Sequence, residues 1–402
     1  MSRAWAVFTL ASLMFFLSQF YRAANAVISP NLLADLSLDT EGLGLLSAAF
    51  FYAFALTQIP ITILMDRVGP RKMMTVLPSV GIAGAVVFSA ASDLTMGIAG
   101  RVLMGVGMAC NLMGTLKLLT LWFGPARFAT LSGMVFAIGS LGNMAATSPF
   151  VLMVESMGWR LSFQVIAGVN LLLVILFLWI VPEKPSSASL DAKGIASDLR
   201  LLLRQKDFWI ISAATMVSYG VFAAFQTLWA GPFLIEAIQL TPLQAGHLIF
   251  LMNLSLIVGG PAWGNLSDHL KSRKWIVFGG QALLALLTLM MTWVGPGTGN
   301  VGLAMLFFSF GFFRMTGSLM YTQIKETMPV RMAGTAMTGI NFFTMMGPAV
   351  FLQGLGKAMQ AFHPEASRSA EAFELSFILC ATCVGVIALL YLFTGETRPQ
   401  DS

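Results

Sequence analysis

The stretch T-I-L-M-D-R-V-G-P-R-K, residues 62–72, places a group of charged side chains on a Gly-Pro turn between two long apolar runs. A second stretch, G-N-L-S-D-H-L-K-S-R-K at residues 264–274, repeats this layout about half of the 402-residue chain later. Asp66 of the first stretch corresponds to Asp268 of the second, and an Arg-Lys pair closes each copy. A charged turn that recurs between apolar runs predicts two copies of one membrane-embedded unit, related as parallel repeats.

The composition of the chain is typical of an integral membrane protein. Hydrophobic residues make up 57% of the sequence, charged residues make up only 10%, and the mean hydropathy is +0.80. Soluble domains carry roughly 25% charged residues, so the lipid bilayer is an expected partner. The net charge of +5 comes from Lys and Arg scattered through short loops without a basic face, and no nucleic acid partner is expected.

About twelve apolar stretches are long enough to cross a bilayer as helices, which takes roughly 20 residues each. Long runs without alternation predict helices and not a barrel. The expected fold is an all-α membrane protein with twelve transmembrane helices in two pseudo-symmetric six-helix halves. The expected spans are 5–28, 42–65, 73–92, 96–122, 128–154, 161–181, 208–235, 243–265, 275–294, 300–324, 332–356 and 373–394.

The polar stretch between the halves predicts the domain organisation. We expect an N-terminal half at residues 1–181, a linker at 182–206 and a C-terminal half at 207–402. The linker begins rich in Pro and Ser, and its later part mixes Leu with Arg and Lys, which is typical of a short helix on the membrane surface. Lys and Arg concentrate in every second loop, which predicts a cytoplasmic linker, cytoplasmic termini and a place in the cell (inner) membrane.

The first charged turn resembles a family signature. The sequence D-R-V-G-P-R-K at residues 66–72 resembles the hairpin signature of the major facilitator superfamily, with Thr62 where the family usually has Gly and with Pro70 displacing the basic pair by one residue. Arg101, followed by spaced glycines, resembles the fourth-helix motif of that family. The resemblance covers essentially the whole chain. It implies a secondary carrier whose first, fourth, seventh and tenth helices line a central path.

The charged turns have two possible roles. A carboxylate at the end of a helix can bind a neighbouring helix N-terminus and a guanidinium, and such a cluster can hold the inner side of a carrier closed. The alternative is that the cations only anchor the loops inside. The recurrence of the Asp favours gating, with a structural role also open for the fourth-helix Arg. The gating residues predicted are Asp66, Arg67, Arg71, Lys72, Arg101, Asp268 and Arg273.

Arg314 is the clearest ionisable residue inside a predicted span, and such residues are costly and usually functional. It lies near the middle of the tenth span, too far from either end for its side chain to reach the headgroups easily. Arg314, Ser318 and Tyr321 recur at i, i+4 and i+7, so an uninterrupted helix would present them on one face. We predict that this face lines the substrate cavity.

Two further spans of the first half carry candidate binding residues. Arg22 and Asn25 belong to a polar stripe in the first span, although Arg22 could also anchor the helix at the interface. Lys117 lies in the fourth span, about five residues from its inner end. Substrate binding and a Lys stem reaching the headgroups are equally compatible with that position.

The seventh span carries a mixed aromatic and polar stripe. Tyr219, Phe222, Gln226 and Trp229 follow helical spacing. Aromatic stripes more often serve packing, but the amide of Gln226 would be unfavourable against lipid. We therefore predict that Tyr219, Gln226 and Trp229 face the cavity.

The lack of acidic residues inside the predicted spans narrows the class of substrate. No Asp or Glu lies deep within a predicted span, so cations without buried anions predict an anionic substrate, held between Arg22 and Arg314. We expect a small carboxylate or organophosphate, carried by alternating access. A zwitterion such as a peptide or amino acid, or a non-transporting sensor on the same fold, remains the alternative.

No catalytic or metal-binding motif is recognisable in the sequence. No phosphate-binding Gly loop of the G-x-x-x-x-G-K type occurs, and three dispersed His residues are too few for a metal centre. We expect no enzyme activity, no cofactor, no metal and a monomeric protein.

Overall fold

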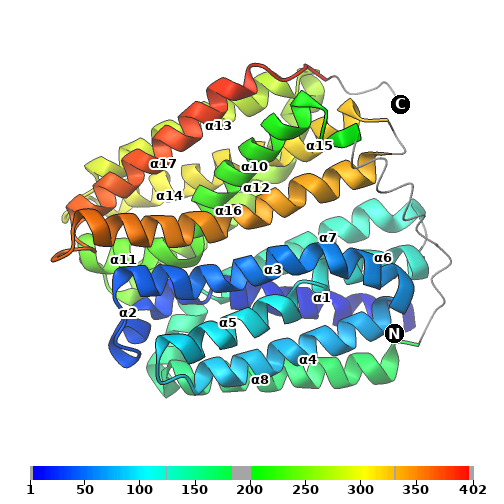
Figure 1. The fold of residues 1–402 in the computed structure, drawn as a ribbon, viewed down its shortest axis with the longest axis horizontal. Coiled ribbons are helices and arrows are strands. Elements are labelled where there is room, and N and C mark those ends of the chain that lie inside the picture. Colours follow the sequence, from blue (N-terminus) through cyan, green and yellow to red (C-terminus); the bar gives the residue numbers. More distant parts are fainter. Residues whose placement is uncertain (1–2, 124, 183–200, 330–331, 398–402) are drawn as a thin grey trace. The chain divides into compact units, whose positions relative to one another are not determined.

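The computed structural model describes residues 3–123, 125–182, 201–329 and 332–397, and within these ranges the regular elements are helices. The chain divides into two compact units, Met1–Leu190 and Asp191–Ser402. Figure 1 shows the long helices of each unit running side by side. The surface helix expected in the later part of the linker is described from residue 201 on, where a helical turn ends before Lys206, with Leu202 buried and Leu203 exposed. Its role at the membrane surface stays a prediction, and residues 183–200 lie outside the described residues.

The first unit contains eight helices that make up its six spans. Its first and fourth spans are each built from two consecutive helices, α1 with α2 and α5 with α6. Gly158 has a φ of 77° inside α8, so the chain turns there between the fifth and the sixth span. The helices are α1 (Arg3–Ala23), α2 (Asn25–Asp35), α3 (Thr40–Val68), α4 (Pro70–Ser89), α5 (Leu94–Met108), α6 (Asn111–Phe123), α7 (Pro125–Ala145) and α8 (Ser148–Ile180).

The second unit interrupts two of its spans with tighter or wider turns. The seventh span contains two π-helical segments, and the tenth contains a 3₁₀ segment. Its elements are α10 (Lys206–Ala224), η1 (Phe225–Trp229), α11 (Ala230–Pro232), η2 (Phe233–Ala237), α12 (Pro242–His269), α13 (Lys274–Met290), η3 (Met291–Trp293), α14 (Asn300–Arg314), η4 (Met315–Ser318), α15 (Leu319–Thr327), α16 (Ala333–Phe362) and α17 (Ala370–Tyr391).

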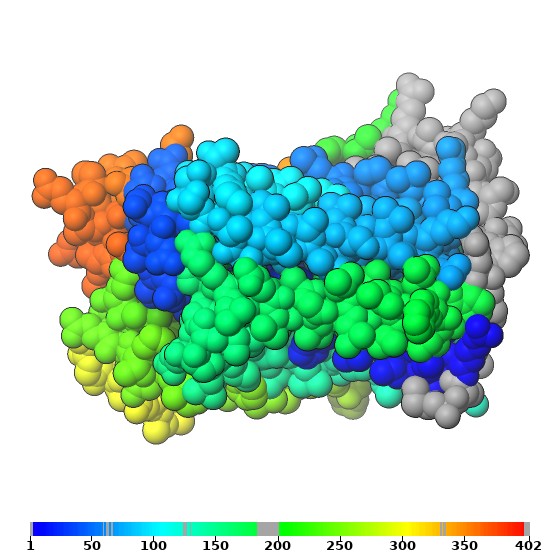
Figure 2. Space-filling model, turned by 90° about the horizontal axis from the view of Figure 1, so that it is seen from below, coloured from blue at the N-terminus to red at the C-terminus, as the bar shows by residue number. Residues whose placement is uncertain are grey.

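Length and hydropathy fit a membrane environment. In the described part of the chain, 11 helices are long and apolar enough to cross a bilayer, and the shorter apolar helix Thr130–Ala145 accounts for the fifth span. The predicted all-α fold of twelve membrane spans is therefore confirmed. α4 and α8 lie side by side on one face of the first unit (Figure 2). Large apolar side chains of α8 such as Trp179, 78% exposed, are suited to lipid on that face.

Glycines allow the closest helix contacts within each unit. A Cβ atom on Gly107 of α5 would lie 2.2 Å from the backbone nitrogen of Gly81 in α4. A Cβ on Gly347 of α16 would lie 2.0 Å from the Met216 carbonyl oxygen of α10. Helices in lipid associate largely through such close backbone packing, because lipid offers no hydrophobic force between them. These pairs hold the helices that carry the candidate site residues in a fixed register.

Candidate functional site

Arg314 lies where α14 ends and the 3₁₀ segment η4 begins. Its guanidinium carbon is 5.0 Å from the ring centroid of Tyr219 and 5.8 Å from that of Phe222, both on α10. Arg is attracted to the faces of aromatic rings at such distances. The Arg314 Nε atom is buried without a hydrogen-bond partner, and no carboxylate pairs with Arg314 in the described part of the chain. The second unit thus holds a half-buried cation whose neighbours are aromatic rings.

The 3₁₀ segment changes which side chains share a face with Arg314. The sequence predicts one continuous helical face, but η4 has about three residues per turn, so the α-helical spacing does not continue through it. Ser318 donates its hydroxyl to the Met315 carbonyl at 2.7 Å. The Tyr321 hydroxyl lies 3.0 Å from Asn341 Oδ1 of α16. The helix between Arg314 and Tyr321 is therefore interrupted, while the shared face and the binding roles of Ser318 and Tyr321 stay predictions.

The predicted stripe of the seventh span is divided in a similar way. Tyr219 lies under Arg314, but Gln226 and Trp229 belong to the π-helical segment η1. A π turn contains an extra residue and therefore rotates the side chains that follow it. The Gln226 amide donates to Asn253 Oδ1 of α12. Trp229, 2% exposed, faces an apolar cavity inside the second unit.

The apolar cavity has no role in the sequence prediction. Its walls come from the seventh, ninth, tenth, eleventh and twelfth spans. The lining residues are Val221, Phe225, Trp229, Thr288, Met291, Phe310, Leu355, Met359, Phe373, Ser376, Phe377 and Cys380.

Arg22 occupies an aromatic environment in the first unit. It is 5% exposed and precedes the break between α1 and α2. Its guanidinium carbon lies 4.8 Å from the Phe54 ring centroid and 5.7 Å from that of Phe51, both on α3. Asn25 donates its amide to Ser47 Oγ at 2.9 Å, and its own Oδ1 is buried without a partner among the described residues. Arg22 in the first unit and Arg314 in the second are therefore alike in lying on aromatic rings of a neighbouring helix.

The two cations of the fourth span contact backbone carbonyls. The Lys117 ammonium donates to the Met65 carbonyl at 3.2 Å, near the end of α3. Arg101 is fully buried and donates to the Tyr21 carbonyl at 2.9 Å, in the last turn of α1. Carbonyls in the last turn of a helix lack partners within the helix, and Arg101 satisfies one of these at the end of α1, whereas Lys117 shares the Met65 carbonyl with the Gly69 N–H. These contacts are structural, and roles in binding or gating stay predictions.

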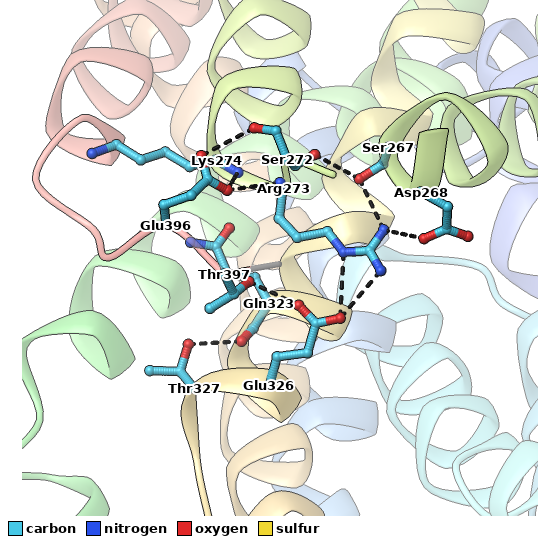
Figure 3. Close-up of polar contacts among 10 residues, drawn as sticks. All are labelled: Ser267, Asp268, Ser272, Arg273, Lys274, Gln323, Glu326, Thr327, Glu396 and Thr397. Carbon is cyan, nitrogen blue, oxygen red and sulfur yellow. Dashed lines mark hydrogen bonds and ion pairs between the residues drawn. The ribbon is translucent and has the colours of Figure 1, made fainter. Parts of the chain in front are cut away.

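The second charged turn forms an ion cluster around Arg273 (Figure 3). Arg273 Nη1 lies 2.7 Å from Asp268 Oδ1, and Nη2 lies 3.1 Å from Glu326 Oε1. Nη1 also donates to Ser267 Oγ at 2.9 Å. Burial lowers the pKa of the Arg273 guanidinium, but the hydrogen bonds to Glu326 and Asp268 raise it more, so the net change is upward. The predicted pairing of the Asp with the basic residues is present in this copy.

Two residues that the sequence prediction missed complete this cluster. Glu396, which follows α17, accepts hydrogen bonds from the backbone nitrogens of Arg273 at 2.9 Å and Lys274 at 3.1 Å. It therefore caps the N-terminus of α13, where unpaired N–H groups favour a carboxylate. The Glu326 carboxylate accepts hydrogen bonds from the Arg273 guanidinium and from the Thr397 hydroxyl. Their only signal in the sequence is an acidic residue just beyond a span.

The first charged turn makes different contacts. Arg71 donates to the Leu178 carbonyl at 2.8 Å, in the last turn of α8. Arg67 and Lys72 have exposed side chains. The side chain of Asp66 lies outside the described residues, so its predicted pairing is not described.

No group of three or more His, Cys, Asp or Glu side chains is arranged to hold a metal ion within the described ranges. The charged clusters therefore consist of ion pairs and backbone contacts.

Comparisons with known proteins found a family model and relatives that match most of this sequence. The sequence model of the Major Facilitator Superfamily matches residues 10–352. The chain is 25% identical over 420 residues to the "Probable sulfoacetate transporter" of Cupriavidus necator, covering 97% of this chain and 93% of that one. It is 24% identical over 356 residues to the hexuronate transporter of Bacillus subtilis, with 82% of each chain covered.

A solved structure matches the fold. A bacterial homolog of the human lysosomal transporter Spinster, crystallised in an inward-facing and unoccupied conformation, gives a TM-score of 0.79. The match covers 97% of this chain and 96% of that chain at 16% identity. At this identity the likeness shows the shared fold alone.

Proposed function

Because this chain belongs to the Major Facilitator Superfamily, we propose that it is a secondary carrier that moves a small organic anion across the membrane by alternating access. The observation that carries the proposal is Arg314, a half-buried guanidinium on aromatic rings with a buried, unpaired Nε and no carboxylate partner among the described residues. A buried charge without a counter-charge is unfavourable, so an anion that enters would satisfy it. Arg22 is a second arginine that lies on aromatic rings, in the first unit.

The names of two relatives support an anionic substrate. Sulfoacetate and hexuronate both carry negatively charged oxygens, and the planar fork of Arg is suited to binding such groups. These names favour a plain carboxylate, sulfonate or phosphate over a zwitterion.

We propose a cytoplasmic location for the linker and both termini, in the cell (inner) membrane. The support is the concentration of Lys and Arg in alternate loops. A cysteine introduced at position 190 should react with a membrane-impermeant thiol reagent only after cells are opened. The half-buried Cys383 is first replaced by Ser, since the other two cysteines are buried. Labelling of position 190 on intact cells would overturn the orientation.

A thermal-shift screen of the purified protein tests the substrate class. We expect stabilisation by one or more small carboxylates, sulfonates or organophosphates, since a ligand that binds only the folded state raises its stability. Stabilisation by organic cations alone would overturn the anion assignment. Stabilisation by amino acids or peptides alone would replace it with the zwitterion alternative.

Flux through reconstituted vesicles tests the carrier mechanism. Saturable uptake that speeds up with substrate on the opposite side supports a carrier. Flux that does not saturate would indicate a channel instead. Binding without any flux would indicate a sensor built on the same fold.

A further inference from the structure

Ser218 carries a buried hydroxyl group without a partner. It lies on α10, is 1% exposed, and its Oγ makes no hydrogen bond to any described residue. Some other buried Ser side chains bond within their own helix. Ser255 donates to the Met252 carbonyl at 2.7 Å, and Ser376 donates to the Ala372 carbonyl at 3.0 Å. The Ser218 hydroxyl is thus available to a group that is not part of its own helix.

Gly317 brings this hydroxyl and Arg314 to the same small space. A Cβ atom on Gly317 would lie 2.6 Å from Arg314 Nη1 and 3.4 Å from Ser218 Oγ. The Nη1 and Oγ atoms can therefore be no farther apart than the sum of these two distances. That sum is close to twice a hydrogen-bond length of about 2.9 Å, so one acceptor atom can bind both donors.

The absence of a side chain at Gly317 keeps this space open. Gly317 belongs to the 3₁₀ segment η4, which directly follows Arg314. Any larger residue would place its Cβ against the guanidinium. Short 3₁₀ segments in the middle of a longer helix often mark functional positions. The segment therefore combines a tight turn with a close approach of its backbone to the Arg314 guanidinium.

We propose that Ser218 is a binding residue for the transported anion, and that its hydroxyl and Arg314 Nη1 hold the same anionic oxygen above Gly317. This inference rests on the proposed function and adds a specificity determinant to it. A neutral hydroxyl donor beside a guanidinium strengthens binding of a charged oxygen, because hydrogen bonds to charged groups are the stronger ones. Gly317 in turn limits the size of the group that can approach.

Substitution of Ser218 should affect substrate binding and protein stability differently, because its hydroxyl has no partner among the described residues. In the protein without substrate, Ser218 Oγ has no described partner, so its removal should not destabilise the fold. In the bound protein the same removal takes away a hydrogen bond to the anion. A residue with a merely structural role would instead lower the melting temperature of the empty protein.

The test measures binding of sulfoacetate and glucuronate to the purified full-length protein, together with the melting temperature without ligand. We expect Ser218→Ala to weaken binding about tenfold, while the empty protein melts at the wild-type temperature or above it. The matched control is Ser212→Ala, on the same helix, also 1% exposed and also without a partner for its Oγ among the described residues. It should bind both probes as the wild type does.

Glycine variants give an independent second measurement. Gly317→Ala should abolish most binding, whereas Gly302→Ala in α14, where a Cβ would meet nothing within 4 Å, should not. Wild-type affinity in both Ser218→Ala and Gly317→Ala would overturn this inference and leave the proposed function standing. A wild-type protein that binds no anion in the screen or in this test would overturn the proposed function itself.

Discussion

Arg273 and Arg314 are both poorly exposed arginines of the second unit, but their surroundings differ completely. Arg273, with a side chain 7% exposed, lies between Asp268 and Glu326 and donates to a Ser hydroxyl. Arg314 lies on the rings of Tyr219 and Phe222, without a carboxylate partner among the described residues.

The difference indicates which arginine is available for a ligand. A guanidinium whose donors are already used by carboxylates contributes to the fold and has little left to bind with. A guanidinium on aromatic rings keeps donors free, and the rings compensate its burial only in part. Substitution at Arg273 should therefore change stability, and substitution at Arg314 should change binding.

The largest effect is expected at Arg314. Arg314→Gln should weaken binding of the true anion at least 30-fold, since the loss of one partner of a buried charge pair costs about 2 kcal/mol or more. Arg314→Lys should keep part of the binding, because it retains the charge without the planar fork. Thermal shift and vesicle uptake measure both effects, with Arg127→Gln at an exposed position as control. Normal transport by Arg314→Gln would make Arg314 a structural residue.

A smaller loss, in stability, is expected at Arg273. Arg273→Met leaves Asp268 and the 19% exposed Glu326 without their shared cation, which should cost about 2 kcal/mol, below the value for fully buried pairs. The apparent melting temperature should fall while affinity for the anion changes little. Adding Glu326→Gln should recover part of the loss, because it removes one of the two carboxylates. A melting temperature equal to that of the wild type would contradict the structural role.

The cap on α13 should contribute less. Glu396→Gln removes the charge that faces the backbone nitrogens of Arg273 and Lys274, and we expect a loss of about 1 kcal/mol. The melting temperature of the purified protein measures it. Glu365→Gln, at an exposed position, should leave that temperature unchanged. Equal melting temperatures of the two variants would exclude Glu396 as a stabilising cap.

The smallest effect is expected at Lys117, whose contacts are intermediate between those of Arg273 and those of Arg314. Its ammonium contacts the Met65 carbonyl, so Lys117→Met should cost no more than about 1 kcal/mol of stability. We expect the affinity for the anion to change less than about twofold, a difference well below 1 kcal/mol. A tenfold loss of affinity in a binding titration would instead assign Lys117 to the substrate site, as the sequence prediction allows.

Local patterns in the sequence determine the class and the outline of the fold. Apolar runs of membrane length predict the spans, and these depend only on hydropathy along the chain. The repeated charged turn predicts the internal repeat, and the position of Arg314 within an apolar run predicts a functional role for it. Each of these signals lies within a short stretch and needs no knowledge of what packs against it.

Tertiary structure alone decides which side chains meet. The π-helical segment η1 and the 3₁₀ segment η4 interrupt the regular helical spacing from which the sequence prediction placed Trp229 and Tyr321. Glu396 reaches the start of α13 from more than 120 residues along the chain. Ser218 and Gly317 come from different spans, and nothing in either stretch announces the space that they share with Arg314. These contacts arise from packing between distant segments, and packing is not a property of any one segment.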